Sequence, residues 1–337
     1  MFLATHPTPR PQHSAIVRQA PVRPTPAAAG WFAREQTIMG TAIRVELWCE
    51  GKRLAAAAAQ AVMDEMHRID RAMSPHRADS ELSRINAWAA RAPVGLSDEM
   101  FNLVERALHF SRLSQGAFDI SYATIGQPYD YHRGIRRSDA AIEQARACVG
   151  YQHLELDERR RTLRFALPGM RIDLGGFAKG HACDTAAALL ARRGIQHAIV
   201  SAGGDSRVIG DRRGRPWTVA VRDPRGPGEA VAVLPLTDVS ISTSGDYGRF
   251  FERDSERCHR LIDPHTGKSP GSVHSVTVLA NDGLTSEALS KCVFVLGVEQ
   301  GLRLVEAQPG VDAVVVDAEG KLHFSSGLGH AAAPVLQ

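Results

Sequence analysis

Residues 171–210 constrain the fold of this chain more than any other part of its sequence, which there reads RIDLGGFAKGHACDTAAALLARRGIQHAIVSAGGDSRVIG. We expect a short strand end first, then a turn, then a helix over 179–193 that is rich in alanine and leucine, which propagate a helix well. A short buried strand over 198–201 and a second tight turn follow. Three glycines lie where the strand gives way to the helix: Gly175, Gly176 and Gly180.

The glycine-rich turn has the properties of a phosphate-binding site. The first backbone N–H groups of a helix have no partner within the helix and favour a phosphate, and glycine lets a ligand come close to the backbone. Asp173 and Asp205 bracket the glycines, and Lys179 places a cation beside them. The chain contains neither the P-loop motif nor the GxGxxG motif of dinucleotide-binding proteins. An ordinary strand–turn–helix–strand crossover without a ligand remains the alternative.

The composition is that of a soluble globular protein, with 44% apolar and 23% charged residues among 337. This length allows one large domain or two ordinary ones. The net charge of +3 and the scattered arginines argue against nucleic acid as a partner. Five widely spaced cysteines without a CxxC motif argue against a disulfide framework and against zinc, so we expect reduced thiols in the cytoplasm.

The first 30 residues are rich in proline, alanine and arginine and have no apolar period, so we expect a disordered leader over 1–30. The apolar run over 1–4 is too short for a secretory signal, which needs about 7–15 apolar residues. No run approaches the roughly 18 residues of a membrane span, so we expect a cytoplasmic protein without a membrane segment. We expect residues 31–330 to form a single domain, with two subdomains as an option.

Hydrophobic periodicity predicts irregularly alternating helices and strands with several hairpins, which favours an α+β fold of mixed β-sheets flanked by helices. In the clearest helix, over 55–73, one apolar stripe is assigned to the core: Val62, Met66, Ile69 and Met73. Further helices are expected around 82–85 and over 98–115, 139–148, 285–295 and 300–307. Strands are expected around 43–47, 219–221, 231–236, 239–242 and 273–280, and hairpins over 153–165 and 311–325.

Five ordered motifs resemble those of the ApbE family, the FAD:protein FMN transferases. The strongest is DLGGFAKGHACD at 173–184, followed by AIVSAGGD at 198–205. A second signature is TSGDYGRFF at 243–251 with LIDPHTGKSP at 261–270. The others are MGT at 39–41, DSELSRIN at 79–86 and GAFDIS at 116–121. The resemblance spans about residues 37–297 and implies the fold of that family, which is related to the T-fold.

The resemblance implies a transferase that uses FAD and Mg²⁺. A threonine hydroxyl of an acceptor protein attacks the phosphorus on the FMN side of the diphosphate, AMP leaves, and the acceptor keeps FMN. The implied FAD contacts come from several segments: Met39, His76, Ala117, Phe118, Asp119, Asp173, Lys179 and Ile262. The implied catalytic residues are Asp173, Lys179 and His259. From the residues alone, Met39 is equally well explained as a core residue. For Asp119 a turn cap is the alternative to flavin contact.

The implied metal ligands are a backbone carbonyl and part of one face of a late helix: Gly176, Glu287, Ser290 and Lys291. Lys291 is a departure, because the family favours threonine there and an ammonium offers no lone pair to Mg²⁺. Either Lys291 points away and Glu287 with Asp263 still holds the metal, or its ammonium replaces part of the charge of the ion.

Arg260 is a second departure, because family members usually have histidine before this turn. An arginine stays charged and cannot relay a proton. The neighbouring His259 is a possible substitute, although on an extended segment its side chain should point the other way.

Three hypotheses follow from these residues. The first is transfer of FMN to a threonine of an acceptor protein. The second is a divergent relative that binds FAD without transfer, which the departures at 260 and 291 favour. The third is hydrolysis of FAD to FMN and AMP, with water in place of the acceptor hydroxyl.

Overall fold

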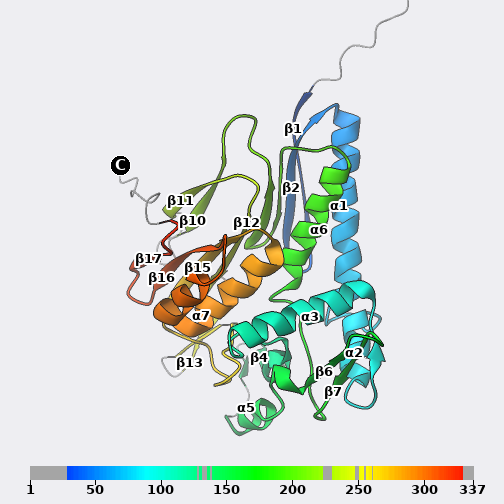
Figure 1. The fold of residues 1–337 in the computed structure, drawn as a ribbon, viewed down its shortest axis with the longest axis vertical. Helices are drawn as coiled ribbons and strands as arrows, with labels where there is room; N and C mark the ends of the chain where they lie inside the picture. The colour runs from blue at the N-terminus through cyan, green and yellow to red at the C-terminus, as the bar shows by residue number, and fades with distance from the viewer. Residues whose placement is uncertain are drawn as a thin grey trace, which may run out of the picture.

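The computed structural model describes residues 29–126, 129–130, 135–136, 139–222, 230–246, 250–253, 256–259 and 261–328. Its centre is an eight-stranded sheet in the order β1-β2-β8-β9-β12-β15-β16-β17, in which all neighbours run antiparallel (Figure 1). These strands are β1 Ala29–Ile38, β2 Thr41–Glu50, β8 Ala198–Ala202, β9 Asp205–Ile209, β12 Ser240–Gly245, β15 Val273–Ala280, β16 Asp312–Asp317 and β17 Leu322–Phe324. The predicted α+β class is confirmed.

Three long helices pack beside this sheet: α1 Lys52–Met73, α6 Ala178–Arg192 and α7 Gly283–Glu306 (Figure 1). The predicted apolar stripe of α1 is buried, as are the inward side chains of β2. One cluster of buried side chains extends along the chain from Ile38 to Val315. Gly297, where we expected one helix to stop and another to follow, interrupts α7 with a φ of 77°.

A second, smaller core lies under a two-stranded ribbon formed by β10 Trp217–Arg222 and β11 Ala230–Leu236. Trp217 and Leu236 from this ribbon pack with Ile241 and Leu279 of the central sheet. The sequence predicted strands over 231–236 and 239–242 correctly, but they belong to different sheets. The chain changes sheet at Asp238, which has a φ of 49°.

The remaining elements gather at one end of the long helices (Figure 1). They are α2 Glu81–Trp88, β3 Val94–Gly95, α3 Asp98–Leu113, the 3₁₀ turns Ile120–Tyr122 and Tyr151–His153, α4 Ala123–Gly126, α5 Asp139–Arg146, β6 Leu154–Asp157 and β7 Thr162–Phe165. Two short strand pairs complete the fold: β4 Tyr129–Asp130 with β5 Ile135–Arg136, and β13 Phe250–Arg253 with β14 Glu256–His259. In the described part of the chain, no helix is both long and apolar enough to cross a membrane.

Two sequence-based expectations are wrong in detail. The expected leader ends too late, because Ala29 and Gly30 already pair with the end of β2; residues 1–28 lie outside the described residues. The segment before α6 is not a strand. The side chain of Asn86 accepts from the backbone N–H of Ile172 at 2.8 Å and donates to its carbonyl at 2.9 Å, and the N–H of Asp173 donates to the carbonyl of Ile120. These partners replace a strand ladder.

Candidate active site

A cavity opens between residues 117–122, the turn at 173–177, the segment 261–264 and the first half of α7. Its walls are mostly apolar. The lining residues are Ala117, Phe118, Asp119, Ile120, Tyr122, Asp173, Gly176, Phe177, Leu261, Ile262, Pro264, Lys291 and Val295. Seven of them were predicted as site residues from the sequence: Ala117, Phe118, Asp119, Asp173, Gly176, Ile262 and Lys291.

Asp119 is both a turn cap and part of the cavity wall. Its Oδ1 accepts hydrogen bonds from the backbone N–H of Ser121 at 2.8 Å and from the hydroxyl of the same residue at 2.7 Å. Its Oδ2 accepts from the N–H of Tyr151 at 2.6 Å. Burial raises the pKa of this carboxyl group, and the hydrogen bonds partly offset that rise. The carboxylate therefore fixes the loop that carries Phe118 into the wall.

Asp173 leads into the glycine turn, and its Oδ1 accepts a hydrogen bond from the N–H of Gly175. Burial raises the pKa of this carboxyl group, while the hydrogen bond and the nearby charges of His76 and Arg171 act in the opposite direction. The side chain of His76 is exposed on the loop after α1 and does not line the cavity. The structure thus brings His76 near Asp173 without making it part of the wall.

Lys179 lies between two buried carboxylates and does not line the cavity. Its Nζ is 2.6 Å from Oδ2 of Asp205 and 2.5 Å from Oε1 of Glu287. Burial alone would lower the pKa of this ammonium, but attraction to the two carboxylates outweighs burial and raises the pKa. Lys179 therefore stays protonated and joins α6 to β9 and α7.

The N-terminus of α6 is occupied by a carboxylate of the protein itself. The N–H of Gly180 donates to Oε2 of Glu287 at 2.7 Å, and a negative charge is favourable at this end of a helix. Gly180 is also the crossing point of two helices, because a Cβ atom there would overlap the backbone carbonyl of Gly283. We expected the first turn of this helix to offer its N–H groups to a phosphate; the N–H of Gly180 is instead used by Glu287.

Three buried serine hydroxyls connect this ion-paired cluster to the central sheet. Ser242 donates to Oδ1 of Asp205 at 2.5 Å, and its hydroxyl lies 3.2 Å from that of Ser290. The hydroxyl of Ser244 lies 2.8 Å from the same Ser290 oxygen. Ser244 was expected only as part of the motif at 243–251, and Ser242 was not expected at the site, although small hydroxyl residues at alternate positions of one strand were a readable signal. Ser290, expected as a metal ligand, belongs to this network.

Lys291 is the one cationic side chain among the described residues that line the cavity. Its Nζ lies 3.4 Å from Oε1 of Glu287 and 3.5 Å from the hydroxyl of Ser290. Its Cε is 3.5 Å from the position that a Cβ atom would take on Gly176. The side chain therefore passes over the glycine turn, at ordinary van der Waals distance from a Cβ atom placed on Gly176.

The residues expected to hold Mg²⁺ do not fit that ion in this arrangement. Both oxygens of Glu287 accept hydrogen bonds, from Lys179 and from Gly180, and Lys291 approaches one of them. Asp263 instead stabilises its own turn, accepting from the N–H of His265 and the hydroxyl of Thr266, each at 2.9 Å. Among the described residues, no group of three His, Cys, Asp or Glu side chains is placed to hold a metal ion. Mg²⁺ needs oxygen ligands. Here the carboxylate of Glu287 is in contact with the ammonium groups of Lys179 and Lys291, which cannot act as ligands.

Met39 and His259 do not line the cavity. Met39 occupies the turn between β1 and β2 with a φ of 53°, and its half-buried side chain packs against the core. The ring of His259 is buried, with Nε2 2.9 Å from the carbonyl of Pro270, and it packs edge-to-face on Phe294. Arg260 lies outside the described residues.

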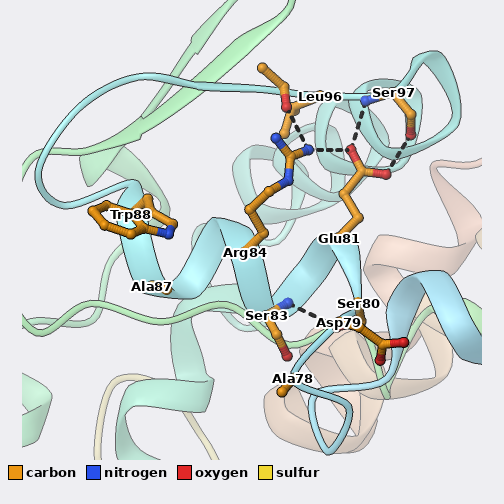
Figure 2. Close-up of a pocket in the computed structure, with 11 residues that line it drawn as sticks. Ala78, Asp79, Ser80, Glu81, Ser83, Arg84, Ala87, Trp88, Leu96 and Ser97 are labelled. Atoms are coloured by element: carbon orange, nitrogen blue, oxygen red, sulfur yellow. Dashed lines mark hydrogen bonds and ion pairs between the residues drawn. The ribbon is translucent and has the colours of Figure 1, made fainter.

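A second, open groove runs along α2 (Figure 2). Two of its charged side chains, Glu81 and Arg84, are labelled in Figure 2. Glu81 accepts from the N–H and the hydroxyl of Ser97, each at 2.7 Å, and Arg84 donates to the carbonyl of Gly95 at 2.9 Å. Trp88, which lines one end of the groove, is 54% exposed. None of the predicted site residues lines this groove, so we place the candidate site in the cavity.

Fold and site together define a class of protein: an α+β protein with a mainly apolar cavity beside a buried lysine–carboxylate cluster. Solved structures share the fold. The ApbE protein from Thermotoga maritima matches with a TM-score of 0.82 and 30% identity, covering 89% of this chain and 98% of that one. The apo form of the flavinyl transferase ApbE from Pseudomonas stutzeri matches with a TM-score of 0.80 and 29% identity, covering 90% and 96%.

Sequence comparison gives the family. A FAD:protein FMN transferase of Treponema pallidum (strain Nichols) is 33% identical over 326 residues, which cover 88% of this chain and 87% of the relative. The sequence profile of the ApbE family matches residues 39–315. The chain therefore belongs to the ApbE family.

Proposed function

We propose that this protein is an FAD:protein FMN transferase, which moves FMN from FAD to a threonine hydroxyl of an acceptor protein and releases AMP. The observation that carries the proposal is the convergence of seven predicted site residues, from four separate segments, in one cavity. The activity named for the Treponema pallidum relative supports the same reaction.

The chemistry of the cavity suits FAD as the substrate. Phe118, Ile262 and Val295 offer apolar surface, which suits a planar flavin ring that leaves water. Lys291 offers a positive charge to the diphosphate. Because Asp119 already accepts three hydrogen bonds, it shapes the wall without needing a ligand.

We assign proton transfer to Asp173. In the reaction, the threonine oxygen of the acceptor forms a bond to the FMN-side phosphorus, the bond from that phosphorus to the oxygen of AMP breaks, and the hydroxyl proton passes to Asp173. Asp173 lines the cavity, and its raised pKa makes it a better proton acceptor than an ordinary carboxylate.

Two other residues first considered catalytic have different roles in this proposal. Lys179 positions α6 against α7 through its two carboxylate partners, and His259 supports the segment at 269–270 through Pro270 and Ser269. No step is assigned to Mg²⁺, because Glu287, the expected carboxylate ligand, is engaged by the ammonium groups of Lys179 and Lys291. With its start moved to Ala29, the domain expected over 31–330 acts as a single unit in this proposal, supported by the continuous buried cluster.

The test is a transfer assay with purified protein, FAD and a library of threonine peptides, each paired with its alanine counterpart. The expected result is a covalent flavin adduct on a threonine peptide, detected by fluorescence and mass, with one AMP released per adduct. Asp173→Asn should lower the rate at least about 100-fold, the size of a lost proton acceptor, whereas the exposed Asp64→Asn control should not change it.

Two outcomes would contradict transfer. Steady AMP release that no peptide increases would identify a FAD hydrolase. Tight FAD binding without AMP release or adduct, across the library and with a folded acceptor domain that is flavinylated by a known transferase, would identify a binding protein.

A further inference from the structure

We propose that Asn86 and Thr124 are positioning residues for the reaction, because their side chains hold the backbone that carries Asp173 into the cavity. The inference rests on the proposed function, in which Asp173 accepts the proton of the acceptor hydroxyl. It also gives a role to the last residue of the motif DSELSRIN at 79–86. It is carried by the hydrogen bonds of three consecutive residues, 171–173.

Side chains from two different helices bind the backbone of residues 171 and 172. The hydroxyl of Thr124 in α4 accepts from the N–H of Arg171 at 3.0 Å and donates to the carbonyl of the same residue at 3.2 Å. The amide of Asn86 in α2 does the same for Ile172, at 2.8 and 2.9 Å. In a β-ladder, likewise, one residue exchanges both of its hydrogen bonds with a single partner. The two side chains therefore do for this segment what neighbouring strands do in a sheet.

The next residue of this segment is Asp173, which is fixed at two points. Its N–H donates to the carbonyl of Ile120 at 2.9 Å, and its Oδ1 accepts from the N–H of Gly175. Among the described residues, no hydrogen bond reaches its Oδ2. The backbone and one carboxylate oxygen of Asp173 are thus held in place, and the second oxygen is left to accept the hydroxyl proton.

Burial makes these hydrogen bonds hard to replace. Ile172 and Thr124 are both buried, and a buried backbone group that loses its partner must move to find another. Asp173 is one residue away, and a shift of about 1 Å in a reacting group can lower a rate about 100-fold. Neither Asn86 nor Thr124 lines the cavity. Loss of either side chain should therefore reach the reaction through Asp173 and not through contact with FAD.

The test measures kcat for transfer at saturating FAD, and the Kd of FAD by flavin fluorescence. Thr124→Val removes the hydroxyl and keeps the shape, so it should lower kcat about tenfold, the effect of one lost hydrogen bond. The Kd should change less than about threefold. Thr124→Ser keeps the hydroxyl and should retain most of the rate. Asn86→Leu should act like Thr124→Val, whereas Asn102→Leu, at an exposed position of α3, should change neither quantity. If Asn86→Leu does not fold, the two Thr124 variants still decide.

A double-mutant cycle separates positioning from a general structural effect. In the Asp173→Asn background, Thr124→Val should lower kcat by less than about twofold, because residues that act through one group have non-additive effects. A full tenfold loss in that background would overturn this inference and leave the transferase standing.

Titration of Asp173 without substrate gives a readout that does not depend on turnover. Burial raises the pKa of this carboxyl group. Release of its segment in Thr124→Val should admit water and lower that pKa, measured by carbon NMR of the carboxyl group with Asp173→Asn to assign the signal. An unchanged pKa in Thr124→Val would overturn the inference. A wild-type protein without transfer activity would instead overturn the proposed function, and the titration alone would then decide whether Thr124 positions Asp173.

Discussion

The backbone of Gly180 in α6 lies directly against the backbone of Gly283 in α7, with no room for a side chain on either residue. This contact sets the distance between the two helices. It thereby brings the ammonium of Lys179 to the carboxylate of Glu287, 108 residues further along the chain. The candidate site depends on this crossing, because α7 also carries Lys291 to the cavity.

The crossing predicts that Gly180→Ala destabilises the protein. Helix propensity alone would favour alanine by about 1 kcal/mol. The new methyl group would overlap the backbone of Gly283, and overpacking of this kind costs about 1–3 kcal/mol or more. Because the overlap is with backbone, which cannot move aside as a flexible side chain can, we take the upper end of this range. After the gain in helix propensity is subtracted, we expect a net loss of about 2 kcal/mol in the free energy of unfolding, measured by urea denaturation. Gly271→Ala, with open space at its Cβ position, is the control; a Gly180→Ala variant as stable as wild type would refute a tight crossing.

Replacing Lys179, the cation shared by Asp205 and Glu287, should lower the free energy of unfolding more than Gly180→Ala does. Lys179→Met leaves Asp205 and Glu287 buried next to each other without their ammonium. Breaking a buried ion pair from one side costs about 3–5 kcal/mol, so we expect a loss of that size in urea denaturation. Lys52→Met, at an exposed position, should change stability by less than about 0.5 kcal/mol. A small loss at 179 would mean that Lys179 is not the link between the carboxylates.

Asp184 should make the protein less stable as pH rises from about 4 to 6. Its Oδ2 accepts a hydrogen bond from the N–H of Gly283 at 2.7 Å, and burial raises its pKa from 3.8 to about 6. The folded state therefore holds a proton that the unfolded state has released, so stability falls with rising pH in this window. Asp184→Asn keeps an acceptor oxygen and should flatten this part of the profile in urea denaturation at stepped pH. An unchanged slope in the variant would contradict the assignment.

Glu99 should show the opposite trend at lower pH. Hydrogen bonds from Arg68, at 2.7 Å, and from His181 lower its pKa from 4.5 to about 2. Because the pKa of Glu99 is lower in the folded state, its ionised carboxylate stabilises the fold at pH values above its pKa in the unfolded chain. This stability is lost as pH falls from about 4.5 towards 2. Glu99→Gln should remove that loss on the acid side while lowering stability at pH 7. The exposed Glu50→Gln serves as the control, and an acid slope that survives in Glu99→Gln would exclude this carboxylate as its source.

Features that depend on the pattern of neighbouring residues in the chain could be predicted from the sequence. The apolar stripe of α1 and the break at Gly297 follow from spacing and from the freedom of glycine at positive φ. The resemblance also selected seven of the residues that line the cavity. What periodicity could not supply was the pairing between segments, because hydrophobic patterns say which face is buried but not which element covers it.

In the candidate site, too, the sequence did not show which distant segments come into contact. Lys179 was expected to meet a phosphate because it follows a glycine turn, but its two carboxylate partners are 26 and 108 residues away. The segment before α6 alternates like a strand, yet Asn86 takes the backbone groups of Ile172. In both cases a distant side chain competes successfully for a group that the local pattern assigns elsewhere.

Because α7 is interrupted at Gly297, its two halves can take different rotations about the helix axis. In a continuous helix, inserting one residue turns everything beyond it by about 100°. Here Glu287, Ser290 and Lys291 all precede the break, while Val305, which follows it, packs in the same buried cluster as Val293 of the first half. The non-helical conformation of Gly297 therefore lets the second half of α7 meet the core at its own rotation about the helix axis, while Glu287 and Lys291 keep theirs.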